Sequence, residues 1–203
     1  MSPKAPSPAT SDRRLAQLEA LLLAAEQRIT QSGAQSLKAR DLASDIGIAL
    51  GGLYNIVKDL DTLLLLVTAR TQARLDSAAT EATAHLPMSN RAEATERLVA
   101  VAISYLDFAQ SHLELWRMMF SVRIAAPLPD WAVQDQLRLF RHIAEPLHVV
   151  MPDLTAELLT IRARTLFAAV HGVISIGLEE RLIAVPRQKL TEEIAWLTRA
   201  ACR

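Results

Sequence analysis

The segment "RDLASDIGIALGGLYNIVKDL", residues 40–60, decides the fold of the N-terminal part of the chain. Two short helical patterns, over residues 38–46 and 50–56, stand on either side of Gly47. Three apolar residues are spaced to lock these two helices together: Ala43, Ile48 and Leu53. A small residue in the turn and exposed polar residues on the second helix complete the requirements of a helix-turn-helix. The segment therefore predicts a unit that can place its second helix in the major groove of DNA.

The rest of the chain also carries helical patterns, and no run of alternating β-branched residues indicates a strand. We therefore expect an all-α fold of about nine helices in 203 residues, of which 51% are hydrophobic and only 6 are Gly. Asp59, Asn90 and Asp130 are expected N-caps, and Pro146 is expected to stop or kink a helix. The expected helices cover residues 13–32, 38–46, 50–56, 60–85, 91–110, 112–120, 130–150, 154–182 and 187–201.

Composition excludes several classes of protein. The formal net charge is zero, and the first 62 residues carry seven basic and seven acidic side chains, so bulk charge gives no support to nucleic-acid binding. The single Cys202 excludes an intrachain disulfide, and the histidines lack the pairing and the neighbours of a metal site, so we expect neither metal nor cofactor. The longest apolar runs, including residues 166–178, are shorter than the roughly 18 residues that span a bilayer. Without a signal-like N-terminus, the expected location is the cytoplasm, away from membranes.

The helix-turn-helix segment resembles the DNA-binding region of TetR-family transcription regulators. Ten residues match the family's pattern in register: Arg40, Asp41, Leu42, Ala43, Gly47, Ile48, Gly51, Leu53, Tyr54 and Leu63. The preceding helix, which closes at Gly33, resembles the first helix of the family. More loosely, residues 105–120 resemble a helix pair of the ligand domain, and residues 166–178 resemble the dimerisation helix. The resemblance covers nearly the whole chain.

The resemblance implies a homodimeric repressor that binds double-stranded operator DNA and is released by a small apolar or amphipathic effector. A disordered tail over residues 1–11 would precede a DNA-binding domain over 12–59 and an effector-binding and dimerisation domain over 60–203. The residues expected at the DNA are Arg40, Leu50, Gly51, Gly52, Tyr54, Asn55 and Lys58. Gly51 would let the helix start approach a phosphate, and Tyr54 would donate a hydrogen bond to one. Asn55 could reach a phosphate or a base edge.

Five positions depart from the family's usual residues: Lys38, Ala49, Leu50, Gly52 and Leu60. Ala49 stands where Ser or Thr usually caps the recognition helix, and Leu60 stands where a Lys usually binds phosphate. These departures favour an alternative, a protein-interaction module that has the fold but has lost ordinary operator binding. Enzyme catalysis is a third class, but no phosphate loop, nucleophile elbow or pair of carboxylates is evident in the sequence.

The effector site is expected among aromatic residues of the C-terminal part, because ligand pockets are mostly apolar with a few polar groups. The candidates are Phe108, Trp116, Phe120, Trp131, Phe140 and His171. For any single aromatic residue, packing in an ordinary core is the commoner role. The homodimer is expected to form through residues 154–182 and 187–201, whose apolar stripes would pair with their copies in a four-helix bundle.

Overall fold

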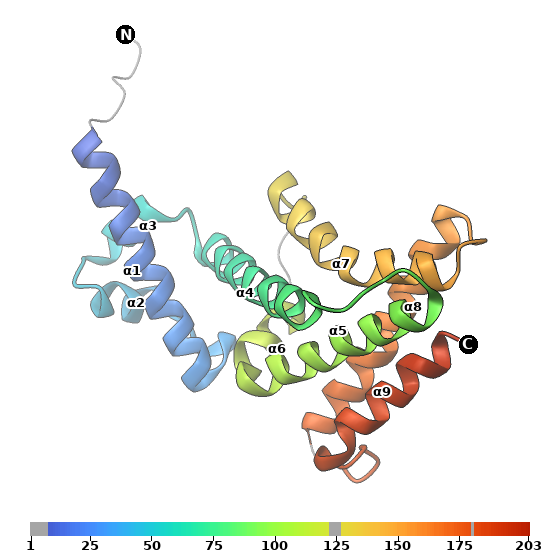
Figure 1. Cartoon of the computed structure of the whole chain (residues 1–203). Coiled ribbons are helices and arrows are strands. Elements are labelled where there is room, and N and C mark those ends of the chain that lie inside the picture. The colour runs from blue at the N-terminus through green and yellow to red at the C-terminus, as the bar shows by residue number, and fades with distance from the viewer. Residues whose placement is uncertain (1–7, 122–126, 180) are drawn as a thin grey trace. The chain divides into compact units, whose positions relative to one another are not determined.

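The computed structural model describes residues 8–121, 127–179 and 181–203, which form nine α-helices and two short 3-10 helices with no strand among them (Figure 1). The predicted all-α class is confirmed. The chain divides into two compact units, which we call unit 1 and unit 2. Unit 1 contains the described residues up to Thr71 and those of 112–128, and unit 2 contains residues 72–111 and those from Pro129 onward.

Unit 1 is an arrangement of helices around one apolar core. Its elements are α1 (Pro8–Ser32), η1 (Ala34–Ser36), α2 (Ala39–Asp45), α3 (Leu50–Ile56), the first part of α4 (Leu60–Thr83) and α6 (Leu113–Ser121). Helix α1 contacts α2, α3 and α6. The fully buried members of the core come from α1 to α4: Leu21, Ile29, Leu42, Leu53 and Leu63. Two residues of α6, Leu115 and Met118, pack into the same cluster.

The first helix is longer than the sequence pattern predicts. It begins at Pro8 rather than at Arg13, so residues 8–11 are helical although they were assigned to a disordered tail. Proline is tolerated in the first turn of a helix, where its missing N–H would have no partner anyway. Residues 1–7 of the expected tail lie outside the described residues. The helix closes as predicted at Gly33, whose φ is +74°.

Two of the three predicted N-caps are confirmed. Asp59 accepts a hydrogen bond of 2.7 Å from the backbone N–H of Thr62 and one of 2.6 Å from its hydroxyl, and these bonds lower the pKa of the Asp59 carboxyl. Asn90 accepts a bond of 3.0 Å from the N–H of Glu93 at the start of α5. These caps fix where α4 and α5 begin.

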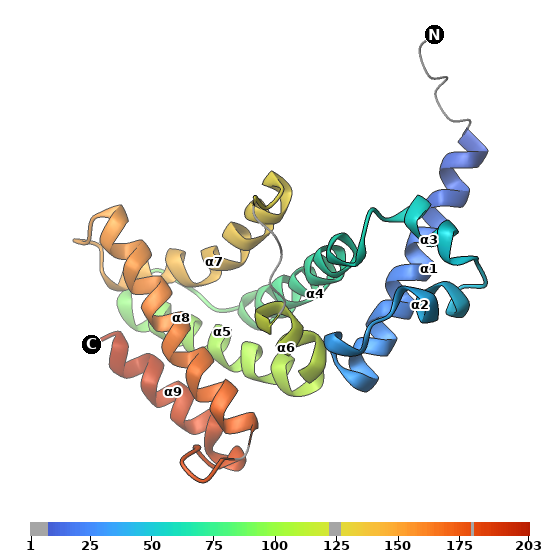
Figure 2. The same ribbon diagram turned by 180° about the vertical axis from the view of Figure 1, so that it is seen from behind.

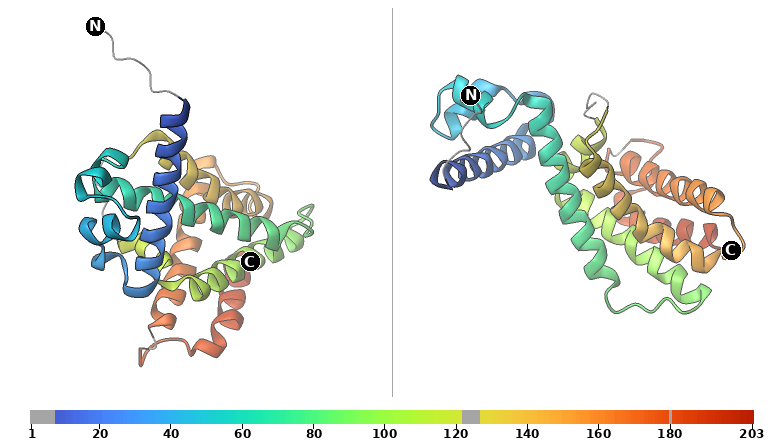
Figure 3. Two further views of the ribbon diagram at one scale, coloured as in Figure 1. Left: turned by 90° about the vertical axis from the view of Figure 1, so that its left-hand side faces the viewer. Right: turned by 90° about the horizontal axis from the view of Figure 1, so that it is seen from above.

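Unit 2 is built around α5. It consists of the last part of α4, α5 (Arg91–Ser111), α7 (Asp130–Val150), α8 (Ala156–Leu178), η2 (Arg187–Lys189) and α9 (Leu190–Ala201). Helix α5 contacts α7, α8 and α9, and α8 lies beside α9 (Figures 2 and 3). The most deeply buried large side chains of this unit are Leu106, Leu147, Ile174, Leu190 and Ile194.

Two details predicted for unit 2 are wrong. The N-cap of α7 is Pro129, and Asp130 is the first helical residue, where its charge still favours the positive end of the helix dipole. Pro146 lies inside α7, which runs on to Val150 as predicted, and the buried Leu147 and Val150 hold the last turn by packing. Helix α8 spans Ala156–Leu178 instead of 154–182, because the Thr155 hydroxyl caps its first turn by accepting from the N–H of Leu158.

Close packing of Gly177 on α8 against Leu190 on α9 generates a stability prediction. A Cβ added at Gly177 would lie 2.5 Å from Cδ2 of Leu190, which is fully buried. We expect Gly177→Ala to lower the free energy of unfolding by about 1–3 kcal/mol, the usual cost of overpacking a core. Urea denaturation of both single variants and the double variant measures it. In a Leu190→Ala background the second substitution should cost little, and equal costs in both backgrounds would contradict the predicted clash.

Candidate nucleic-acid interface and effector site

The turn between α2 and α3 is closed by backbone geometry. Gly47 has a φ of +69°, the left-handed region that glycine adopts without strain. Its N–H donates to the carbonyl of Ser44 at 3.1 Å, and the N–H of Ile48 donates to the carbonyl of Ala43 at 2.9 Å. These two bonds satisfy carbonyls at the end of α2 and turn the chain into α3.

The predicted lock between the two helices is confirmed. Ala43 of α2 and Leu53 of α3 are buried, and Ile48 from the turn packs against the same cluster. Ile56 and Val57 extend this buried side of α3 to the end of the helix. Because one side of α3 is committed to the core, its other side is left to solvent.

The residues predicted to meet DNA lie on the solvent side of unit 1, with one exception. Leu50 is 39% exposed and Tyr54 is 49% exposed, although both are large and partly or wholly apolar. Four further members of the predicted set are exposed: Arg40, Gly51, Asn55 and Lys58. Gly52, in the first turn of α3, is half-buried and so is the least exposed of the set.

The two adjacent glycines of α3 have different surroundings. A Cβ built on Gly51 would meet nothing within 4 Å, whereas one built on Gly52 would lie 3.5 Å from Cδ1 of Ile48, an ordinary van der Waals distance. Neither glycine has the positive φ that would require it. The fold therefore tolerates alanine at both positions, and a need for glycine would have to come from a ligand. The N-cap of α3, Ala49, makes no side-chain hydrogen bond.

Some basic side chains of unit 1 form ion pairs, and others do not. Arg28 makes two hydrogen bonds to Asp45, one of them 2.8 Å long from Nη2 to Oδ1, and they lower the pKa of the Asp45 carboxyl. Arg70 of α4 pairs with Glu19 at 2.8 Å and with Glu26 at 3.1 Å, both on α1. Within the described residues five exposed cations of this unit have no such ion pair, namely Arg13, Arg14, Lys38, Arg40 and Lys58.

The glycine pair generates a prediction that separates folding from binding. Gly51→Ala and Gly52→Ala should each raise the free energy of unfolding, by up to about 1 kcal/mol, because alanine is the better helix former and both sites have room. Thermal or urea denaturation measures this. If Gly51 faces a DNA backbone, only Gly51→Ala should also weaken DNA binding in a mobility-shift assay. Equal DNA affinities for the two variants would contradict a special role for Gly51.

An aromatic cluster of unit 2 includes two of the predicted effector residues. Phe140 of α7 lies with its ring centroid 5.5 Å from that of Phe167 on α8, and Phe167 stacks on His171 at 5.6 Å. Tyr105 of α5 lies 5.8 Å from Phe167, and its hydroxyl is 2.9 Å from Nδ1 of His171. We call these four residues the aromatic cluster. It combines ring surfaces with one polar pair, the composition expected of a ligand site.

The other four predicted effector residues do not join this cluster. Phe108 is buried on α5, and Trp131 is exposed at the start of α7. Trp116 and Phe120 belong to α6 in unit 1, where their rings meet edge-on at 5.7 Å. Sequence reasoning missed Tyr105 and Phe167, although Phe167 precedes His171 by four residues and so shares its side of α8.

His171 generates a pH prediction. Burial lowers the pKa of its imidazole below the usual 6.5, so above that pH the ring is neutral in both the folded and the unfolded chain. As the pH falls from 6.5 toward the lower folded value, the unfolded state takes up more protons and stability is lost. We expect urea denaturation at pH 7.5 and pH 5.5 to show a smaller loss in His171→Gln than in the wild type. The same loss in both proteins would contradict this prediction.

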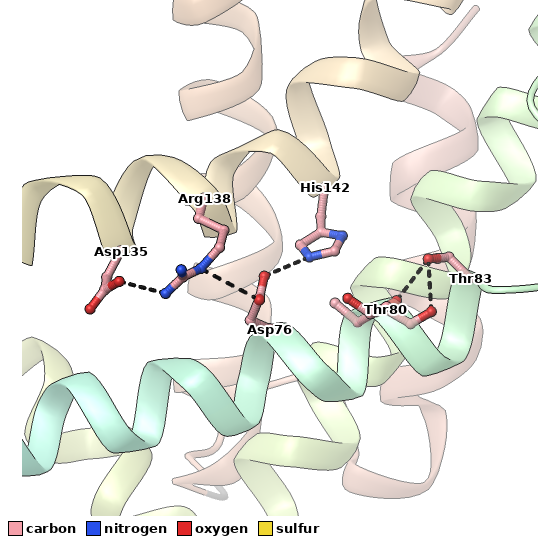
Figure 4. A network of polar contacts seen from close by, with 7 residues as sticks. Asp76, Thr80, Thr83, Asp135, Arg138 and His142 are labelled. Atoms are coloured by element: carbon pink, nitrogen blue, oxygen red, sulfur yellow. Dashed lines mark hydrogen bonds and ion pairs between the residues drawn. The ribbon is translucent and has the colours of Figure 1, made fainter. Parts of the chain in front are cut away.

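A second polar network joins α4 to α7 within unit 2 (Figure 4). The Asp76 carboxylate lies 2.9 Å from Nε2 of His142 and 3.6 Å from Nε of Arg138, and Arg138 also pairs with Asp135 at 2.5 Å. The end of α4 is held by Arg97 of α5, which donates to the carbonyls of Thr83 at 2.8 Å and Leu86 at 2.6 Å. These contacts fix the last two turns of α4 to α5 and α7.

Two other possibilities for the described residues are a metal site and a membrane-spanning helix. No group of three or more His, Cys, Asp or Glu side chains in them is placed to hold a metal ion. Helix α8 alone among the described helices is long and apolar enough to cross a membrane, with a mean hydropathy of 1.3 and 33% of the tested window buried. The apolar run 166–178, considered above from the sequence, is shorter than α8 itself. Because core helices of water-soluble proteins pass the same test, length and composition do not decide the role of α8.

The chain was compared with known protein families, curated proteins and solved structures. A family model described as the C-terminal domain of tetracycline-repressor-like proteins matches residues 98–200. The chain belongs to the TetR family. A search of curated proteins finds no match. Members of the TetR family are transcription regulators, and the chain is therefore a TetR-family regulator.

Solved structures show the same fold over nearly the whole chain. A Rhodococcus sp. RHA1 protein of unknown function is similar at a TM-score of 0.73, with 21% identity over 92% of this chain and 96% of the other. A TetR transcriptional regulator from Rhodococcus sp. RHA1 has a TM-score of 0.60, with 18% identity over 93% and 97%. RolR in complex with resorcinol has a TM-score of 0.62, with 16% identity over 91% and 95%. At these identities the likeness establishes the TetR fold.

Proposed function

We propose that this TetR-family regulator is a homodimeric repressor that binds operator DNA through α3 and is released by a small effector. The observation that carries the proposal is the exposed side of α3. Leu50, Tyr54 and Asn55 are left to solvent there, while Leu53 on the opposite side is fully buried. A helix held by its inner side, with large residues on its outer side, is what insertion into a major groove requires.

Charge supports a modest but defined contact with the DNA backbone. Arg40 and Lys58 flank the exposed side of α3 in the sequence, and neither is in an ion pair with the described residues. Tyr54 would donate its phenolic hydrogen bond to a phosphate, and the missing Cβ of Gly51 would let the backbone approach another. These contacts position the helix, and base edges specify the site. As DNA is the partner, the proposed location is the cytoplasm.

One observation favours a second candidate, a protein-interaction module on the same fold. The N-cap Ala49 makes no side-chain hydrogen bond, and Leu60 rather than a lysine follows the helix-turn-helix. A partner protein would use the exposed Leu50 and Tyr54 as apolar contacts and would need little charge. The two candidates differ in whether duplex DNA binds at all.

The aromatic cluster is the proposed effector site. Phe140 and Phe167 supply ring surface, and the hydrogen-bonded pair of Tyr105 and His171 supplies polarity, which suits a small apolar or amphipathic molecule. RolR, one of the structural neighbours, is described with resorcinol bound, which supports a small effector for this fold. Because Phe140 lies on α7, an effector at the cluster would favour one packing of α7, and the contacts of Asp76 would pass that preference to α4.

Exposed apolar residues support homodimerisation through residues 154–182 and 187–201. Leu158, Ile161 and Ile176 of α8 are 48%, 50% and 42% exposed, and Trp196 of α9 is 60% exposed. Large apolar side chains at helical spacing on one side of a long helix mark a contact surface. A second copy would bury them in a four-helix bundle, and two α3 helices about 34–36 Å apart could then enter successive major grooves.

The experiment that tests the proposed function is a mobility-shift assay with the DNA that flanks the protein's own coding region. We expect the wild type to bind at low salt, and Tyr54→Phe to bind several-fold more weakly because it loses one phosphate hydrogen bond, about 1 kcal/mol. Ser77→Ala is the control, because it removes one exposed hydroxyl within unit 2. Its DNA affinity should equal that of the wild type.

Two results of this assay would contradict the proposal. An absence of binding by the wild type at low salt, with and without cell extract, would exclude the repressor and favour the protein-interaction candidate. Undiminished binding by Tyr54→Phe would remove the phosphate contact assigned to Tyr54.

The dimer surface has its own test. Ile161→Glu should convert the dimer to a monomer at micromolar concentration, because a carboxylate would be buried without a partner in the bundle. Sedimentation equilibrium or light scattering measures the mass. Leu15→Glu on α1 is the control, because Leu15 is 61% exposed and lies in unit 1. A dimer that survives Ile161→Glu, or that is lost equally in Leu15→Glu, would place the contact elsewhere.

A further inference from the structure

The first turn of α3 offers no side chain that can make a hydrogen bond. Its N-cap is Ala49, and the next three residues are Leu50, Gly51 and Gly52. The first polar side chains of the helix are those of Tyr54 and Asn55, a full turn later. If side chains of this first turn recognise DNA bases, they can do so only through apolar contacts. Leu50 is the only residue of the turn that is large enough to make such a contact.

Leu50 is placed to make that contact. It is 39% exposed, and the two residues that follow it have no side chain to cover it. It precedes Tyr54 by four residues, so the two side chains lie one above the other on the same side of α3. Leu53, by comparison, is fully buried in the core of unit 1. A duplex that meets the Tyr54 hydroxyl also lies within reach of Leu50.

The major groove presents one apolar group, the 5-methyl of thymine. The edges of guanine, adenine and cytosine display hydrogen-bond donors and acceptors that an aliphatic side chain cannot pair and would desolvate. We propose that Leu50 reads the methyl group of a thymine in each half of the operator. This inference rests on the proposed function, and it identifies Leu50 as a specificity-determining residue for a thymine-bearing site.

The contribution of this contact to DNA affinity can be predicted from the area of one methyl group. Burying one methyl group against Leu50 would strengthen binding about fourfold, which corresponds to about 0.8 kcal/mol. Deoxyuridine differs from thymidine only by the absence of this methyl group and keeps the same hydrogen-bonding edge. Replacing the contacted thymine by deoxyuridine should therefore weaken binding about fourfold in each half-site and leave every polar contact in place.

The experiment uses the full chain and a selected duplex. Duplexes bound by the wild type are recovered from a pool of random-sequence double-stranded DNA, and one is resynthesised with each thymine replaced in turn by deoxyuridine. Fluorescence anisotropy at one fixed salt concentration gives the dissociation constants for the wild type, Leu50→Ala and Tyr54→Phe. We expect the wild type to lose about fourfold at one or more thymines, and Leu50→Ala to bind the thymine and deoxyuridine duplexes equally.

Tyr54→Phe separates base reading from backbone contact. It should bind all duplexes more weakly by one common factor and keep the fourfold difference between thymine and deoxyuridine. A wild type that binds the selected duplex but is indifferent to deoxyuridine at every position would overturn the inference and leave the proposed function standing. Persistence of the difference in Leu50→Ala would also overturn it. Failure to recover any duplex would overturn the proposed function itself.

Discussion

The left-handed conformation of Gly47 is the constraint on which the helix-turn-helix of unit 1 depends. Its φ of +69° lets the last carbonyls of α2 find N–H partners in the turn, so α2 ends after Asp45 and the chain reverses within four residues. A residue with a Cβ would strain this turn by roughly 1–2 kcal/mol. Because the turn sets the angle of α3, it decides that Leu53 enters the core while Leu50 and Tyr54 remain outside.

Helix α4 is held by different partners along its length. Arg70 connects its first part to the carboxylates of Glu19 and Glu26 on α1, and Asp76, six residues later, connects its last part to His142 and Arg138 on α7. Each set of contacts therefore fixes one part of α4 within its own unit.

Local signals in the sequence predicted the DNA-binding unit well, because a short helix, its caps and its glycine turn are encoded by neighbouring residues. The bounds of α3 and the stops at Gly33 and Gly47 follow from such signals. Pro146 was predicted to stop or kink α7 because its ring and missing N–H oppose a helix, but α7 runs on to Val150, and burial of the residues after the proline offsets that cost. Tertiary packing of this kind leaves no local pattern.

The residues of the proposed effector site were harder to predict for the same reason. Trp116 and Phe120 lie close in sequence to the helices of unit 2, yet α6 packs against α1 in unit 1. Tyr105 meets His171, 66 residues later in the sequence, only because α5 and α8 are neighbours in space. Composition made the aromatic residues candidates for a ligand site, but their grouping depends on how the helices pack. The functional boundary predicted after residue 59 stays a prediction, since compactness does not test what each part binds.

The exposed side of α3 is proposed to bind duplex DNA through phosphates and bases. The most direct test is the dependence of the dissociation constant on salt, measured with the flanking or selected duplex. If Arg40 and Lys58 of both protomers contact phosphates, the logarithm of the binding constant should fall linearly with the logarithm of salt concentration, with a slope of about −4. Arg40→Gln should reduce the slope by about 2. A binding constant that does not change with salt would contradict the account.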